Sequence, residues 1–174
     1  MVAIVVVVAG RQGLVAYQDK ARTTAANAYL VAVEATAPDA LEAIAAEGGE
    51  GYPMLAQFAV AARLAEAGDD AAEDAYLVLA NDAALDPIYR EAAMLFSVMN
   101  ASGSSVEERM TRIGGIAGAD GPWQKLALEL MIGLSLEKGD IAAARTHLQT
   151  LRFSPDISAD LNQRLLLIDA ALGE

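Results

Sequence analysis

The sequence predicts an all-α fold, an α-solenoid of helix pairs, from its composition and from the spacing of two residue types. Of its 174 residues, 55% are hydrophobic but only 5% are aromatic, and the abundant alanine and leucine favour closely packed helices. Prolines recur at intervals of 34, 35 and 33 residues, at Pro53, Pro87, Pro122 and Pro155. Glycines follow the first three by 15 to 17 residues, at Gly68, Gly103 and Gly139. A period near 34 is that of a helix–turn–helix repeat.

Each interval from proline to glycine is predicted to be one helix. Proline is tolerated in a first helical turn, and glycine suits the left-handed residue that follows a helix. A capping residue then opens a second helix: Asp69, Ser104 or Ser105 with Glu108 in a capping box, and Asp140. The predicted pairs are 53–67 with 69–83, 87–100 with 104–117, and 122–138 with 140–152.

Further helices are predicted on both sides of these pairs. A helix over 155–172 ends at Gly173 and carries the apolar stripe of a terminal capping helix, at Leu161, Leu165, Ile168 and Leu172. A short helix over 38–46, closed by two glycines, and a longer one over 14–36 come before the pairs. The expected organisation is an apolar N-terminal segment, N-terminal helices and a repeat domain, over 1–13, 14–50 and 51–174.

The repeats partly resemble the tetratricopeptide family. Residues 66–76 and 137–148 carry its Gly-Asp turn and small residues, with Ala144 at the most demanding small position. The equivalents of Ala144 are Glu73 and Glu108, and the family's early tryptophan is replaced by Gln57, Ala92 and Leu128. The resemblance therefore implies about three degenerate tetratricopeptide-like helix pairs.

The chain also resembles a narrower group, the tetratricopeptide-like proteins of Gram-negative bacteria related to the ancillary subunit of the SecYEG translocon (the YfgM type). This resemblance rests on residues 62–93 and 121–151 and on the closing Ser-Pro helix with Arg164. It implies one membrane helix and a periplasmic repeat domain that assists translocated proteins beside a membrane-bound chaperone.

The apolar run 2–9 leaves three interpretations open. It is much shorter than the about 20 residues that a spanning helix needs, and Arg11 ends the apolar stretch. We expect it to be the outer end of the membrane anchor that the resemblance implies. The alternatives are a buried helix or strand of the domain, or the remnant of a secretory signal, although no basic region precedes the run.

Acidic residues are concentrated in one part of the chain. The net charge is −12, and residues 34–91 hold 13 acids against two bases, which argues against a nucleic-acid surface. The expected partner-binding residues are four of these acids and one tryptophan: Glu66, Asp70, Glu73, Asp74 and Trp123. The alternatives are a solvated helix start for the acids, and packing between repeats for Trp123, which stands beside a proline as Tyr52 does.

The sequence offers little to enzyme chemistry, and we expect no enzyme, no cofactor and no metal. Cysteine is absent and His147 is the only histidine, which excludes thiolate and multi-histidine sites. The acids lack the order of a calcium loop. The glycine-rich stretches 48–51 and 114–121 lack the Lys-Ser/Thr ending of a phosphate loop, and they are predicted to be linkers.

The expected function is protein–protein interaction through a helical-repeat surface, with other proteins or peptides as partners. The resemblance places it at the periplasmic side of the inner membrane, in support of protein translocation or envelope protein folding. The alternative is a soluble homo-oligomeric module in which residues 14–36 form an intermolecular helix.

Overall fold

The computed structural model describes residue 20 and residues 22–34, 38–49 and 51–173. The chain divides into two compact units, Met1–Val60 and Ala61–Glu174, which we call the N-terminal unit and the repeat unit. Within the described residues every regular element is an α-helix, which confirms the predicted all-α fold.

The N-terminal unit contains the helical residues 22–34, helix α2 (Pro38–Ala45) and the larger part of helix α3 (Tyr52–Glu66). Its core is formed by Ala32, Leu41 and Ala56. The short helix predicted over 38–46 is confirmed, and the two glycines that follow it have positive φ angles of 68° and 84°.

Two of the N-terminal predictions fall largely on residues that the structure does not describe. Segment 1–13 lies outside the described residues. Of the predicted helix 14–36, the described residues are helical, namely 20 and 22–34. No helix in the part of the chain that the structure describes combines the length and hydropathy that a bilayer span requires.

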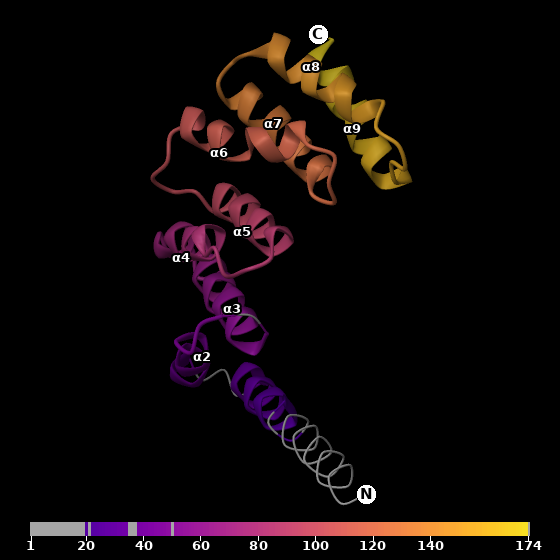
Figure 1. Ribbon diagram of the computed structural model, residues 1–174. Helices are drawn as coiled ribbons and strands as arrows, with labels where there is room; N and C mark the ends of the chain where they lie inside the picture. Colours follow the sequence, from indigo (N-terminus) through magenta and orange to yellow (C-terminus); the bar gives the residue numbers. More distant parts are fainter. Residues whose placement is uncertain (1–19, 21, 35–37, 50, 174) are drawn as a thin grey trace, which may run out of the picture. The chain divides into compact units, whose positions relative to one another are not determined.

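The repeat unit contains six complete helices: α4 (Ala71–Asn81), α5 (Pro87–Met99), α6 (Val106–Gly118), α7 (Gln124–Glu137), α8 (Ile141–Arg152) and α9 (Ala159–Leu172). Each packs against the next one in the chain, most extensively α4 against α5 and α7 against both α6 and α8 (Figure 1). Helix α5 also contacts α7. This sequential packing agrees with a helical repeat.

One apolar core runs through the repeat unit from α5 to α9. Its fully buried side chains include Leu95, Ile113, Ile132, Leu148, Leu151 and Leu165. Helix α9 buries three residues of its predicted stripe, and the fourth, Ile168, packs partly buried against the same core. The predicted role of α9, to cover the end of the array, agrees with this packing.

Several helix boundaries follow the predicted caps. Gly68 and Gly139 have positive φ angles of 67° and 78°, as expected of the residue that follows a helix. The capping box between Ser105 and Glu108 is present at the start of α6. The Asp140 carboxylate accepts a hydrogen bond of 2.9 Å from the backbone N–H three residues later.

Gly103 and Pro122 are not at the helix ends where their spacing places them. Gly103 is outside the left-handed region, because α5 already ends at Met99 and Asn100 caps it. Pro122 lies in the turn before α7. A periodic proline or glycine therefore marks the neighbourhood of a helix end without always occupying it.

The last helix begins later than predicted. Pro155 lies in a bend, and α9 starts at Ala159 after the N-cap residue Ser158. The Ser158 hydroxyl accepts a hydrogen bond of 3.2 Å from the Leu161 N–H. A serine at this position satisfies a helix N–H, whereas a proline is only tolerated in the first turn, so the serine determines the start.

The prediction of a linker over 114–121 is wrong for its first part. Helix α6 continues to Gly118, and only 119–121 lie outside it. Ala117 in this last turn is buried, and so is Ile113 just before the segment. Their burial offsets the low helix propensity of glycine, which costs about 1 kcal/mol per residue relative to alanine.

Candidate functional site

Three of the four acids predicted to bind a partner are exposed around the turn between α3 and α4. Glu66 is the last residue of α3, Asp70 precedes α4, and Asp74 lies in the first turn of α4. The turn itself is fixed by Gly68 and by the Asp69 carboxylate, which accepts a hydrogen bond of 2.9 Å from the Ala71 N–H. The three exposed acids therefore share one edge of the repeat unit.

The fourth acid, Glu73, is only 6% exposed, so the prediction of a solvated position is wrong for this residue. One of its carboxylate oxygens accepts a hydrogen bond of 2.6 Å from Arg112 of α6 and another from the Ser104 hydroxyl. The other oxygen accepts hydrogen bonds from the backbone N–H groups of Ser102 and Gly103, at 3.2 and 3.4 Å.

This network joins α4 to α6 and to the connection before α6. Arg112 also donates a hydrogen bond of 2.8 Å to the Ser104 hydroxyl, so the three side chains contact one another. Glu73 and Ala144 occupy equivalent places in their repeats, and both are buried. The signal that sequence reasoning missed is this position: a glutamate at a buried place of the repeat needs a cation, and Arg112 supplies it 39 residues later.

The pKa of Glu73 follows from these surroundings. Burial alone would raise the pKa, but the hydrogen bonds from Arg112, from Ser104 and from the two backbone N–H groups outweigh burial. Together they lower the pKa from 4.5 to about 2. Glu73 is therefore an anion at neutral pH, and its charge stabilises the fold.

We expect acid to weaken the fold through Glu73. Because its folded-state pKa is lowered, its contribution to the free energy of unfolding is complete above pH 4.5 and is lost as the pH falls toward about 2. Urea unfolding of the full chain, followed by circular dichroism over this range, measures the loss. In Glu73→Gln the loss should be smaller, and an equal loss in both proteins would contradict the assignment.

Trp123 packs between repeats, one of the two roles predicted for it. Its indole N–H donates a hydrogen bond of 2.8 Å to the carbonyl of Ile88 near the start of α5, and its half-buried ring packs against the core. Tyr52 belongs to the N-terminal unit, where its ring centroid lies 5.7 Å from that of Tyr29. Each of these two rings therefore packs against a preceding part of the chain.

Arg164 of α9 contacts a helix two positions earlier. Its guanidinium donates hydrogen bonds of 2.9 and 3.1 Å to the two carboxylate oxygens of Glu129 in α7. The Glu73–Arg112 pair joins α4 and α6, and Trp123 ties the start of α7 to α5. All three contacts skip one helix of the array, and we call them second-neighbour links.

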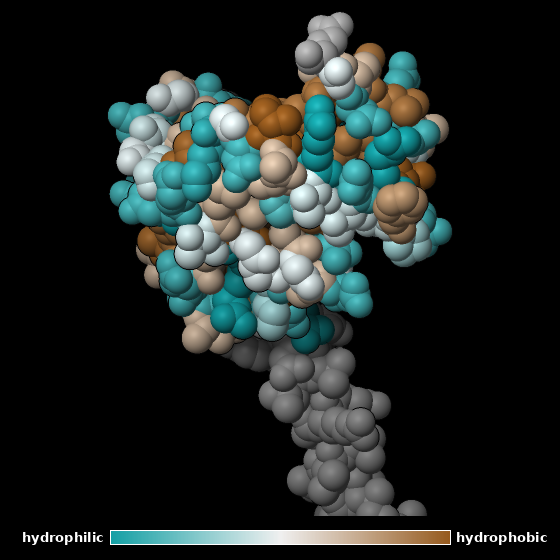
Figure 2. All heavy atoms as spheres, turned by 90° about the horizontal axis from the view of Figure 1, so that it is seen from above, coloured by the Kyte–Doolittle hydropathy of each residue, from teal (hydrophilic) through white to brown (hydrophobic). Residues whose placement is uncertain are grey.

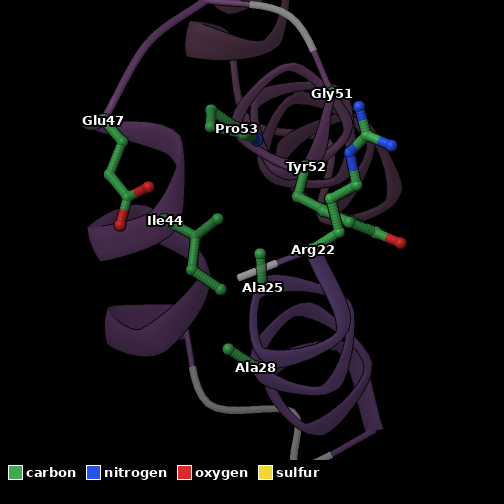
Figure 3. A pocket seen from close by; sticks show the side chains of 8 residues that line it. All are labelled: Arg22, Ala25, Ala28, Ile44, Glu47, Gly51, Tyr52 and Pro53. Atoms are coloured by element: carbon green, nitrogen blue, oxygen red, sulfur yellow. The ribbon is translucent and has the colours of Figure 1, made fainter. Parts of the chain in front are cut away.

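A cavity of about 570 Å³ lies in the N-terminal unit. Its walls come from residues 22–34, from α2 and from the start of α3, and its apolar lining is Ala25, Ala28, Ile44, Tyr52 and Pro53 (Figure 3). Two charged side chains of opposite sign, Arg22 and Glu47, also line it. No motif in the sequence indicated this cavity.

The repeat unit exposes apolar side chains in several places. Figure 2 shows hydrophobic residues in separate groups among hydrophilic ones on the face that it presents. The large hydrophobic residues exposed in this unit are Val78, Ile88, Tyr89, Met99, Leu136, Ile141, Phe153, Leu166 and Leu167. On this face, scattered exposure of this kind provides contact area for a partner.

The described residues form no metal site, and the comparisons with known proteins identify no functional site. In the described ranges no group of three or more His, Cys, Asp or Glu side chains is placed to hold a metal ion. His147 is half-buried on α8. No protein-family model, curated protein or solved structure matches the chain.

Proposed function

We propose that the protein is a scaffold for protein–protein interaction, which binds proteins or peptides on the surface of its helical repeats. The observation that carries the proposal is the sequential packing of α4 to α9. Helices stacked in this way form an extended array whose side faces stay accessible, and such faces are the usual binding surfaces of helical repeats.

We further propose that this scaffold is tethered to the inner membrane and acts in the periplasm, in protein translocation or envelope protein folding. This part rests on the sequence resemblance. Expression of the tagged protein from its native gene tests it: the tag should fractionate with inner membranes and be cut by protease added to spheroplasts. A tag found in the cytosol would overturn it.

Self-association is the second candidate function, and one observation favours it. Residues 22–34 expose Leu30, Val31 and Val33, with Val31 64% exposed. A helix with large exposed apolar residues is a suitable contact between copies. Sedimentation velocity of the full chain over a range of concentrations separates the two candidates, because only self-association makes the mass depend on concentration.

Client binding is tested with a fluorescent polypeptide that is unfolded in urea and diluted into buffer with the full chain. We expect saturable binding by fluorescence anisotropy, with a Kd on the order of micromolar, and no binding of the same polypeptide in its folded state. If none of the unfolded polypeptides in a panel binds, the proposed scaffold function is overturned.

The exposed acids provide a sharper prediction. We expect the triple variant Glu66→Gln, Asp70→Asn, Asp74→Asn to bind a basic unfolded client with an association rate about 10-fold lower and an almost unchanged dissociation rate. The physical reason is that exposed charges steer encounter and are screened by salt. Stopped-flow measurements at low and physiological salt check both rates.

A matched control removes three exposed acids that lie away from the α3–α4 turn, one between α6 and α7 and two around the start of α9, in Asp120→Asn, Asp156→Asn, Asp160→Asn. It changes the net charge equally, so any difference between the two triple variants reports the location of the charges. Glu73 is left intact in both, because its removal weakens the fold. Equal association rates in the two variants would show that the α3–α4 acids are only a solvated surface.

A further inference from the structure

We propose that the cavity of the N-terminal unit binds an apolar side chain of a client peptide, with an acidic residue of that peptide at Arg22 and a basic one at Glu47. This inference rests on the proposed scaffold function and assigns to it a site outside the repeats. The sequence predicts partner binding on the repeats and at the acidic residues. The cavity, in contrast, is formed entirely by residues of the N-terminal unit.

The cavity has the size and lining of a site for an apolar anchor. Its volume of about 570 Å³ lies within the range of about 300 to 1,000 Å³ that is usual for ligand sites. Ala25 and Ala28 present only methyl groups from residues 22–34, which leaves space opposite Ile44 of α2 (Figure 3). A leucine or similar side chain placed there would bury its apolar surface against the apolar residues that line the cavity.

The charges that line the cavity define the chemistry of the occupant. Arg22 lies in the helical residues 22–34, and Glu47 lies in the connection after α2. In the described part of the chain neither side chain has an ion-pair partner. A purely apolar ligand would form no ion pair with either side chain. A peptide with an apolar anchor between an acid and a base complements all three features, and this complementarity sets its orientation.

The walls are held in place by contacts within the unit, so the site is formed before a ligand arrives. The Gln57 side-chain amide donates a hydrogen bond of 3.0 Å to the Ala45 carbonyl, which ties α3 to the end of α2. The Tyr52 ring lies against the ring of Tyr29. Gly51 has a φ angle of 85°, a conformation that few other residues adopt, and it directs the chain into α3. Such preorganisation lowers the cost of binding.

The test uses fluorescein-labelled peptides and the full chain. The probe peptide carries two leucines between an aspartate and a lysine, and its control has serines in place of the leucines. We expect anisotropy titrations to show binding of the probe and at least about 10-fold weaker binding of the serine peptide. Ala28→Phe fills the cavity and should also weaken probe binding at least about 10-fold. Ala25→Leu is the second, smaller filling variant.

The matched control is Ala142→Phe, which places the same ring on an exposed alanine of α8 and should bind the probe as the natural chain does. Circular dichroism melts confirm that each variant folds. Arg22→Glu should weaken binding of the probe and should favour a peptide in which lysine replaces the aspartate. Equal binding by the Ala28→Phe and Ala142→Phe variants, or no recovery with the lysine peptide, would overturn the inference.

Failure of the cavity is distinguishable from failure of the scaffold function. If Ala28→Phe leaves the binding of unfolded clients unchanged, the cavity is not the site, although the scaffold function stands. If neither the natural chain nor any of the variants binds a client, the scaffold function itself is wrong. A concentration-dependent dimer that Ala28→Phe abolishes would overturn the peptide occupant in favour of a second copy.

Discussion

Glu73→Gln is expected to lower the free energy of unfolding by about 3 kcal/mol. The amide keeps the size of the side chain but removes the charge that Arg112 and two backbone N–H groups face. The guanidinium is then left partly buried without its anion. Urea unfolding at neutral pH, followed by circular dichroism, measures the change.

The control for this prediction is Asp74→Asn, one residue later on the exposed side of α4. It removes the same charge and should change the free energy of unfolding by no more than about 0.5 kcal/mol. The double variant Glu73→Ala, Arg112→Met replaces both charged side chains by apolar ones, with alanine at the position that Ala144 occupies in its repeat, and should recover most of the loss. Equal effects of the Glu73 and Asp74 substitutions would disprove the buried pair.

Leu165→Ala should cost about 2 to 5 kcal/mol, because it removes a fully buried side chain from the contact of α9 with the core. Leu167→Ala is the matched control: it is the same substitution two residues later, where the side chain is 67% exposed. It should change the free energy of unfolding by less than about 0.5 kcal/mol. The two melting curves, compared under the same conditions, check the prediction.

The two results also test whether α9 is a cover for the end of the array. If Leu165→Ala unfolds α9 alone, hydrogen exchange should accelerate only in α9, while the amides of α5 to α7 stay protected. If it weakens the whole repeat unit, all helices should lose protection together. An effect of Leu167→Ala as large as that of Leu165→Ala would contradict the assigned orientation of α9.

The helices were predictable because their signals are local. A serine or aspartate cap, a glycine after a helix and a proline in a first turn each act within a few residues, and Ser105, Asp140 and Gly139 behave as such signals predict. The predictions failed at Pro155 and Gly103, where periodicity was used instead of the cap itself.

The candidate sites were less predictable, because they depend on contacts between distant residues. A count of charges cannot distinguish Glu73 from Asp74, since only the presence of Arg112 in α6, two helices later, makes burial of Glu73 favourable. The cavity could not be predicted from the sequence either. It lies where two alanines face Ile44 and Tyr52, and these residues form no recognisable sequence motif.

The second-neighbour links have a consequence for how the array comes apart. A stack in which only adjacent helices touch frays from its ends one helix at a time, because each helix loses only one interface. Here, loss of α9 also frees Glu129 in α7, and loss of α6 also frees Glu73 in α4. The Glu129–Arg164 pair is largely exposed, so its loss costs little. A state that has lost α6, by contrast, leaves the buried Glu73 without its cation two helices away, which makes that state costly and favours unfolding of α4 to α6 in a single cooperative step.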